Sequence, residues 1–233
     1  MANEPGIAPV RAVIFDMDGL LLDTEGVYTA VTQQIAGRFG KTFDWEVKQN
    51  TIGRGARDLA EYVVGALELP MSVDDFLAER EPLLQAGFAD SPAKPGAVSL
   101  VRQLARRGVP IAVGTSSSRA YVEIKTARHR DWFGLFNVVV TADDPDVRAA
   151  KPAPDIFLVA ARRLGVAPHE ALVFEDSPFG VTAARAAGMQ VIAVPDPAMS
   201  RERFAHAHSV LDSLDQFDPG PWGLPACLEG DVR

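Results

Sequence analysis

The sequence predicts an α/β protein whose core is a doubly wound, Rossmann-like and mostly parallel sheet, with an all-helical cap domain inserted into it. Three observations lead to this prediction. Short apolar runs recur along the 233 residues, helical patterns lie between most of them, and one long stretch near the N-terminus holds helical patterns only. Buried parallel strands are encoded by continuous apolar runs, and such runs alternate with helices in open sheets that are covered on both faces.

The predicted strands of the core are the apolar runs themselves. They cover residues 10–15, 111–114, 138–140, 171–174 and 191–194. Helices are expected over 97–107, 154–164 and 178–187, because each of these patterns stops at a glycine. Ser177 suits the N-cap of the third helix, and Pro178 suits its first position.

The stretch 24–93 breaks this alternation, because it contains no convincing strand. Its first two helices are marked by apolar stripes at helical spacing, Val27, Val31, Ile35 and Phe39, then Leu59, Val63 and Leu67. Ser72, with Asp75 three residues on, marks the start of a third helix. We expect a second domain on two hinges. The predicted division is 9–23 plus 94–233 for the α/β core, and 24–93 for the helical cap domain.

Charge balance and cysteine content exclude several classes of protein. The chain has 23 Lys and Arg against 31 Asp and Glu, a net charge of −8, which disfavours a protein whose main partner is nucleic acid. A single cysteine, Cys227, excludes an internal disulfide and any multi-cysteine metal site. No apolar run approaches the roughly 18–20 residues that span a bilayer, and the first residues lack the apolar segment of a secretion signal. We expect a cytoplasmic protein without membrane or nucleic-acid partners, and the oligomeric state stays open.

Polar side chains follow three of the predicted strands directly. These segments are Asp16-Met17-Asp18-Gly19, Thr115-Ser116-Ser117 and Glu175-Asp176-Ser177. Ligands of open α/β sheets bind beyond the carboxyl ends of the strands, so we expect these side chains to share one crevice. Several carboxylates in one crevice repel each other and need a cation. With only oxygen ligands available, the pattern favours a hard ion, Mg²⁺, in a site shared with a substrate phosphate.

The same crevice contains groups for phosphoryl transfer. Asp16 is placed as a nucleophile, since carboxylates form aspartyl-phosphates. Asp18 could protonate the leaving oxygen and later activate water. Thr115, the backbone N–H groups of residues 114–117 and Lys151 suit the oxygens of a phosphate. Each motif alone is more often a turn or a helix cap, and it is their joint placement at strand ends that indicates a site.

These residues together resemble the haloacid dehalogenase-like (HAD) phosphohydrolase superfamily. The resemblance rests on 16–25 (DMDGLLLDTE), Thr115-Ser116, 151–157 (KPAPDIF) and 174–180 (FEDSPFG), and the insert resembles the C1 cap of that superfamily. Within it, residues 69–72, 125–129, 143–147 and 223–225 are similar to the pseudouridine-5′-phosphatase-like group.

The resemblance implies a role for each motif residue. Asp16 corresponds to the nucleophile and Asp18 to the general acid and base. Mg²⁺ ligands correspond to Asp16, the backbone carbonyl of Asp18 and Asp176, with Glu175 acting directly or through water. Thr115, Ser116 and Lys151 correspond to phosphate binders.

The cap is expected to select the leaving group. The segment 51–57 is glycine-rich and basic, so Arg54 or Arg57 is predicted to contact the substrate, the alternative being a plain turn with solvent-facing arginines. The predicted function is a Mg²⁺-dependent phosphatase of a small phosphate monoester, with pseudouridine 5′-phosphate as one candidate. A phosphomutase is the first alternative, although Tyr28 stands where the resembling β-phosphoglucomutases carry a histidine. A non-catalytic binding protein is the second alternative, disfavoured because the carboxylates and Lys151 are present.

Overall fold

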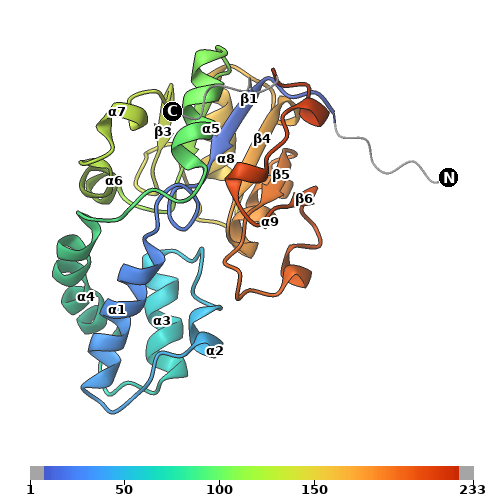
Figure 1. Cartoon of the computed structure of the whole chain (residues 1–233). Helices are drawn as coiled ribbons and strands as arrows, with labels where there is room; N and C mark the ends of the chain where they lie inside the picture. The colour runs from blue at the N-terminus through green and yellow to red at the C-terminus, as the bar shows by residue number, and fades with distance from the viewer. Residues whose placement is uncertain (1–7, 226–233) are drawn as a thin grey trace.

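Six parallel strands form one sheet in the part of the chain that the computed structural model describes, residues 8–225 (Figure 1). The strands are β1 (Ala12–Phe15), β2 (Ile111–Gly114), β3 (Val138–Val140), β4 (Ala171–Glu175), β5 (Gln190–Ala193) and β6 (Ser209–Val210). Their order in the sheet is β3-β2-β1-β4-β5-β6, so the chain moves outward from β1 first in one direction and then in the other. This order places a crevice at the carboxyl end of β1. The predicted fold class is confirmed, and β6 is a short strand that the sequence pattern did not predict.

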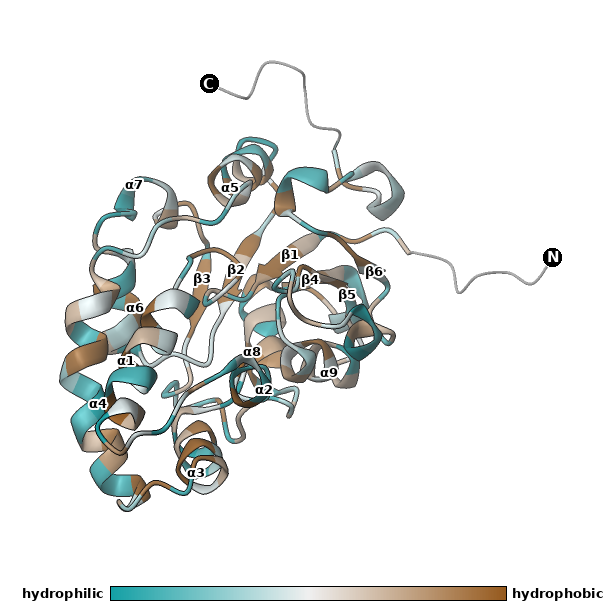
Figure 2. Ribbon diagram, turned by 60° about the horizontal axis from the view of Figure 1, so that its bottom comes forward, coloured by the Kyte–Doolittle hydropathy of each residue, from teal (hydrophilic) through white to brown (hydrophobic). Residues whose placement is uncertain are grey.

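Helices cover both faces of the sheet. The strands are largely brown in Figure 2, the colour of hydrophobic residues. The helices are α5 (Ala97–Arg106), α6 (Arg119–Thr126), α7 (Arg130–Phe133), α8 (Asp155–Leu164) and α9 (Pro178–Ala186). Single-turn 3₁₀ helices lie at Pro168–Glu170, Arg201–Phe204, Leu214–Gln216 and Gly220–Trp222. Alternate residues of β1 face opposite layers, since Val13 and Phe15 pack with α5 and its neighbours, while Ile14 packs with α8 and α9.

The four cap helices form a separate apolar cluster below the sheet in Figure 1. They are α1 (Glu25–Gly37), α2 (Trp45–Lys48), α3 (Ala56–Ala66) and α4 (Val73–Phe88). Ser72 caps α4 as expected, because its hydroxyl accepts a hydrogen bond from the backbone N–H of Asp75 at 3.0 Å. Tyr121 and Ile124 of α6 pack against this cluster, so the cap helices touch the core beside the sheet.

Two chain segments connect the cap helices to the core, and they run side by side. The backbone N–H of Asp23 donates to the carbonyl of Pro92 at 2.8 Å, and that of Lys94 donates to the carbonyl of Leu21 at 2.9 Å. The first connection follows closely on the Asp16–Gly19 segment, so it lies beside the predicted site. Cys227 lies outside the described residues, and among residues 8–225 no helix has the length and apolar character needed to cross a membrane.

Candidate active site

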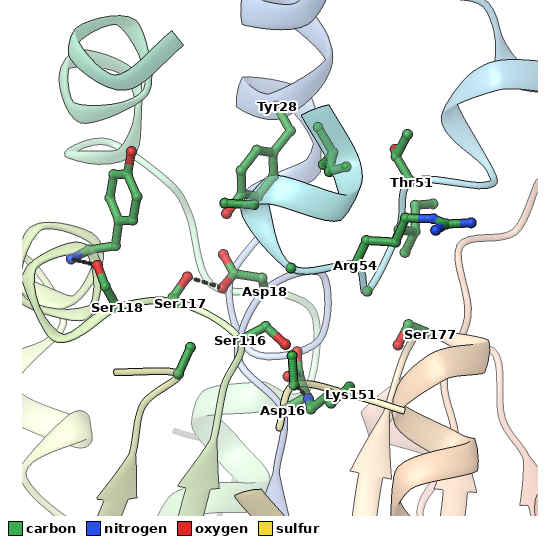
Figure 3. A pocket seen from close by; sticks show the side chains of 18 of the residues that line it. Asp16, Asp18, Tyr28, Thr51, Arg54, Ser116, Ser117, Ser118, Lys151 and Ser177 are labelled. Carbon is green, nitrogen blue, oxygen red and sulfur yellow. Dashed lines mark hydrogen bonds and ion pairs between the residues drawn. The ribbon is translucent and has the colours of Figure 1, made fainter. Parts of the chain in front are cut away.

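The carboxyl ends of β1, β2 and β4 open into a cavity of about 340 Å³ between the sheet and the cap helices (Figure 3). Asp16, Ser116 and Lys151 lie on the sheet side of this cavity, and Tyr28 and Arg54 reach it from the cap. A cavity of this size accommodates a small molecule larger than a phosphate ion.

Lys151 is the centre of a buried polar group at the floor of the cavity. Its Nζ lies 2.5 Å from Asp16 Oδ1 and 2.7 Å from Glu175 Oε1, and it donates to the carbonyl of Gly114 at 3.2 Å. These three partners stand at the ends of three different strands, so the sheet itself positions the lysine. Burial by itself lowers the pKa of Lys151, but the two carboxylates outweigh burial and raise it above its ordinary value. The lysine is therefore held as a cation on the floor of the cavity.

The carboxylates of this group carry more negative charge than the lysine offsets. Burial raises the pKa of Asp16 to about 7, against the attraction of Lys151 and with added repulsion from Glu175 and Asp18. Burial also raises the pKa of Asp176 well above its ordinary value, and Glu175 and Asp16 raise it further. A further positive charge at this point would relieve the repulsion.

Glycines let the acidic side chains approach the backbone closely. A Cβ placed on Gly19, whose φ is +81°, would lie 2.1 Å from Asp176 Oδ2. The Asp176 carboxylate therefore sits against the backbone that follows Asp18. A Cβ on Gly180 would lie 1.7 Å from Glu175 Oε1, so the first turn of α9 passes directly over the Glu175 carboxylate. Glu175 Oε2 accepts hydrogen bonds from the N–H and hydroxyl of Ser177, at 2.8 and 2.9 Å.

The residues present fit a divalent cation of the Mg²⁺ type. Between residues 8 and 225, no three His, Cys, Asp or Glu side chains are grouped as a metal site by themselves. Lys151 engages Asp16 and Glu175, and the Asp18 carboxylate contacts Lys125 and Ser117. The Asp16 and Asp176 carboxylates and the backbone carbonyl of Asp18 would offer such a cation oxygen ligands only. Mg²⁺ commonly binds to one or two carboxylates and completes its coordination with water and substrate phosphate.

Asp18 is held away from Lys151 by a second lysine, Lys125 of α6. Lys125 Nζ forms an ion pair with Asp18 Oδ1 and donates to Ser117 Oγ at 2.8 Å and to the Tyr28 hydroxyl at 3.0 Å. Asp18 Oδ2 accepts from Ser117 Oγ at 2.8 Å and from Thr115 Oγ1 at 3.3 Å. Burial would raise the pKa of Asp18, but Lys125 and these hydrogen bonds lower it overall. This arrangement favours the ionised form of Asp18.

The structure brings most of the predicted phosphate-binding residues together, but in different roles. Ser116 and Lys151 line the cavity. Thr115 is fully buried behind it, where its hydroxyl donates to Asp18 and accepts from the backbone N–H of Ser117 at 3.0 Å. Thr115 therefore supports Asp18 and the turn that follows β2.

Of the two arginines predicted to contact the substrate, only one lies at the cavity. Arg54 lines the cavity, its Nε donates to the carbonyl of Asn50 at 2.6 Å, and its guanidinium lies 4.9 Å from the Phe179 ring centre. Arg57 does not reach the site, because its side chain is 62% exposed and pairs with Asp74 at 2.9 Å. Arg57 lies in the first turn of α3, and its partner Asp74 lies in the first turn of α4.

Two buried basic residues of the site were missed from the sequence, Lys125 and Arg80. Lys125 lies on α6, a short helix that the pattern did not predict, one turn after the buried Val122. Arg80 lies on α4 in the spacing of Phe76, Leu84 and Phe88, all of them buried. A basic residue at an apolar position of a helical stripe is the signal that could have revealed both.

Comparisons with known proteins found similar sequences and structures over most of the chain. A family model described as haloacid dehalogenase-like hydrolase matches residues 10–188. The Drosophila melanogaster protein "Probable pseudouridine-5′-phosphatase" is 47% identical over 229 residues, covering 97% of this chain and 99% of that protein. The Arabidopsis thaliana protein "(DL)-glycerol-3-phosphatase 1, mitochondrial" is 46% identical over 229 residues, covering 96% of this chain and 77% of that protein.

A solved structure shows the same fold. The HAD family hydrolase from Deinococcus radiodurans R1, with bound phosphate and sodium, superposes with a TM-score of 0.76 at 27% identity, covering 94% of this chain and 99% of that chain. The family model spans most of the chain, and the relatives named as phosphatases match nearly all of it. This chain therefore belongs to the haloacid dehalogenase-like hydrolase family, and it is an enzyme of the phosphatase type.

Proposed function

We propose that this enzyme is a Mg²⁺-dependent phosphatase that hydrolyses a small phosphate monoester through a phosphoryl group carried on Asp16. The observation that carries the proposal is the Asp16–Lys151–Glu175 group on the floor of the cavity, with Asp18 beside it. Pseudouridine 5′-phosphate and glycerol 3-phosphate are the candidate substrates that the names of the relatives suggest.

Phosphate binding falls to the sheet side of the cavity. Lys151 Nζ, the Ser116 side chain and the N–H groups of the turn after β2 would contact the oxygens of a phosphate, and this role is supported by the position of Ser116 and Lys151 in the cavity lining. Asp16, Asp176 and the backbone carbonyl of Asp18 would hold Mg²⁺, with Glu175 acting directly or through water. The charge of the bound ion would offset the repulsion between the phosphate and the attacking carboxylate.

Hydrolysis then takes two displacements at phosphorus. An Asp16 oxygen forms a bond to phosphorus while the ester oxygen leaves and takes a proton from Asp18. Water then attacks phosphorus and gives a proton to Asp18, and the bond to Asp16 breaks to release inorganic phosphate. The ion pair with Lys125 favours the ionised Asp18 that the second step requires, so the first step needs Asp18 Oδ1 to leave Lys125 and take up a proton.

The cap helices would exclude bulk water during the first step. We propose that residues 24–93 act as a cap domain on the paired connections at Asp23–Pro92 and Leu21–Lys94. The loop at Gly53 already touches the core in this structure, since a Cβ there would lie 2.3 Å from Ser177 Oγ. Opening and closing of this contact would admit the substrate and release the alcohol.

Release of inorganic phosphate from glycerol 3-phosphate and pseudouridine 5′-phosphate tests the proposal, with and without added Mg²⁺ and with EDTA. Asp16→Asn should lower kcat at least about 1,000-fold, because an amide is a far poorer nucleophile. Asp131→Asn is the matched control, since Asp131 is an exposed partner of Arg102 outside the cavity. Full activity in EDTA would contradict the metal dependence, and activity of Asp16→Asn within about tenfold of the wild type would contradict the covalent route. Conversion of a sugar phosphate to its isomer without phosphate release would favour the phosphomutase alternative.

A further inference from the structure

Arg80 is a buried cation on the cap side of the cavity. Its side chain lines the cavity, and the residue is only 3% exposed. It belongs to the inward face of α4, one turn after Phe76 and one turn before Leu84. An aliphatic residue at this position would continue the apolar stripe, so the arginine interrupts the packing pattern of its own helix.

Two nitrogens of the Arg80 guanidinium lack hydrogen-bond partners within the described chain. Both Nε and Nη2 are buried, and neither has a hydrogen-bond partner among the described residues 8–225. An arginine carries five donor N–H groups and a permanent charge. Moving a charged donor from water into the protein without a hydrogen-bond partner lowers the stability of the folded state, so buried polar groups are normally paired.

The acidic groups near Arg80 are engaged elsewhere. Glu81 accepts a hydrogen bond from the Tyr121 hydroxyl. Glu25 faces Lys48, with 3.9 Å between its Oε2 and Nζ. The group that Arg80 does contact is the ring of Tyr28, whose centre lies 5.1 Å from the guanidinium carbon. A ring face attracts the charge but accepts no directed hydrogen bond in the plane of the guanidinium.

The position of Arg80 relative to the reacting groups is the second part of the argument. Tyr28 points from the cap toward Asp18 (Figure 3), and Arg80 stands against the Tyr28 ring within the same cavity. Lys151, paired with Asp16, lies on the opposite, sheet side. Besides Arg80, the polar residues Glu25, Thr51, Arg54 and Glu81 line the cavity from the cap side. The apolar lining residues on this side are Ile52, Leu59, Leu77 and Leu84.

We propose that Arg80 is a specificity residue that binds an oxygen acceptor on the leaving group of the substrate. The substrate class is then a phosphate monoester whose alcohol carries a hydroxyl, carbonyl or carboxylate oxygen remote from the ester bond. The unpaired N–H groups find their partner only when such a group enters, so the interaction adds to binding without a competing protein acceptor. This inference rests on the proposed phosphatase function and extends it from the phosphate to the leaving group.

A ligand-binding role and a packing role of Arg80 have different consequences when the residue is replaced. If Arg80 only supported the cap, its replacement would destabilise the protein and affect every substrate equally. If it awaits a ligand, Arg80→Leu removes a buried unpaired charge, so the enzyme without ligand becomes more stable while substrate selection is lost.

The experiment compares wild type, Arg80→Leu, Arg80→Gln and Arg38→Leu. Arg38 is the matched control, a cap arginine of the same size that is 53% exposed and pairs with Glu79 at 2.6 Å. Steady-state kinetics use glycerol 3-phosphate for the hydroxyl, pseudouridine 5′-phosphate for the carbonyl and 3-phosphoglycerate for the carboxylate. Phenyl phosphate is the reference ester, because its leaving group carries no oxygen besides the ester oxygen. Thermal unfolding is measured without substrate.

We expect Arg80→Leu to lower kcat/KM about 10- to 100-fold for the preferred oxygen-bearing substrate, mainly through KM, and less than about threefold for phenyl phosphate. The kcat/KM of Arg80→Gln should lie between those of Arg80→Leu and the wild type. If Arg80→Leu does not fold, Arg80→Gln alone is compared with the wild type. Tm of Arg80→Leu should rise by about 2–4 °C, and Arg38→Leu should match the wild type in selectivity.

An equal loss for phenyl phosphate and the other substrates would overturn the proposal, as would unchanged kinetics for all of them. A lowered Tm together with an equal loss would assign Arg80 to packing. A wild type that releases phosphate from none of the four esters would instead reject the proposed function itself.

Discussion

Gly180 allows Glu175 to hold Lys151, and its replacement by alanine tests that arrangement. Gly180 lies in the first turn of α9, without a positive φ, so alanine fits its backbone. On helix propensity alone, Gly→Ala in a helix stabilises by up to about 1 kcal/mol. The structure predicts the opposite sign, because the new Cβ would lie 1.7 Å from Glu175 Oε1 and 1.9 Å from its Cδ.

The magnitude follows from what the displaced carboxylate loses. Glu175 accepts from Lys151 Nζ at 2.7 Å and from the Ser177 backbone N–H at 2.8 Å. A hydrogen bond to a charged group contributes about 1.5–3 kcal/mol, and overpacking costs about 1–3 kcal/mol. After the gain in helix propensity is subtracted, we expect Gly180→Ala to lower the free energy of unfolding by about 2–4 kcal/mol. We also expect kcat to fall at least about tenfold, because Lys151 loses one of its anchors.

Urea unfolding and steady-state kinetics measure both effects, with the midpoint interpreted only where the m value is unchanged. Gly65→Ala in α3 is the matched control, because nothing lies within 4 Å of the added Cβ. That variant should be stabilised by about 0.5–1 kcal/mol and keep full activity. A Gly180→Ala enzyme as stable and as active as Gly65→Ala would refute the close approach of the helix to Glu175.

Two further predictions concern Lys125 and Glu25. Lys125→Met removes the cation beside Asp18, so the pKa of Asp18 should rise and the pH profile of kcat/KM should move to higher pH. We also expect kcat to fall at least about tenfold, because a charge-assisted contact is lost. Lys41→Met, which breaks an exposed pair with Glu68, is the control, and an unshifted pH profile of Lys125→Met would exclude this role of Lys125. Burial raises the pKa of Glu25 to about 7, so the folded state binds this proton more tightly than the unfolded state, and stability should rise as pH falls from about 8 to about 5. Glu25→Gln should remove about 2–3 kcal/mol of that rise, measured by urea unfolding at several pH values, whereas equal pH slopes for the variant and the wild type would contradict it.

Several predicted elements depended on local chemistry and could be found from the sequence. Ser72 and Ser177 cap α4 and α9 through hydrogen bonds to an N–H three residues on, at 3.0 Å in both cases. β1 and β4 are continuous apolar runs that end directly at acidic residues. A period or a cap is a property of neighbouring residues, so it is readable without knowledge of the fold.

The shorter elements were not predictable in this way. β6 has two residues, and α6 carries polar side chains along most of its length, so neither has a clear period. Arg54 and Arg57 lie three residues apart in one basic segment, yet only Arg54 lines the cavity, because Arg57 turns toward Asp74. The direction of each side chain was decided by the start of α3 and its packing beside α4.

The sequence by itself determined the sheet, the helical insert and the acidic and hydroxyl groups at the strand ends. Parallel strands bring their carboxyl ends to one edge, so the spacing of the motifs along the chain already implied a common site. Only the tertiary structure decided which basic side chains complete that site. Asp18 meets Lys125 across 107 positions of the chain. Two guanidinium nitrogens of Arg80 have no hydrogen-bond partner in the described part of the chain, beside a cavity that is lined by both the cap helices and the core. Such contacts depend on how the layers pack in three dimensions, and no local pattern encodes that packing.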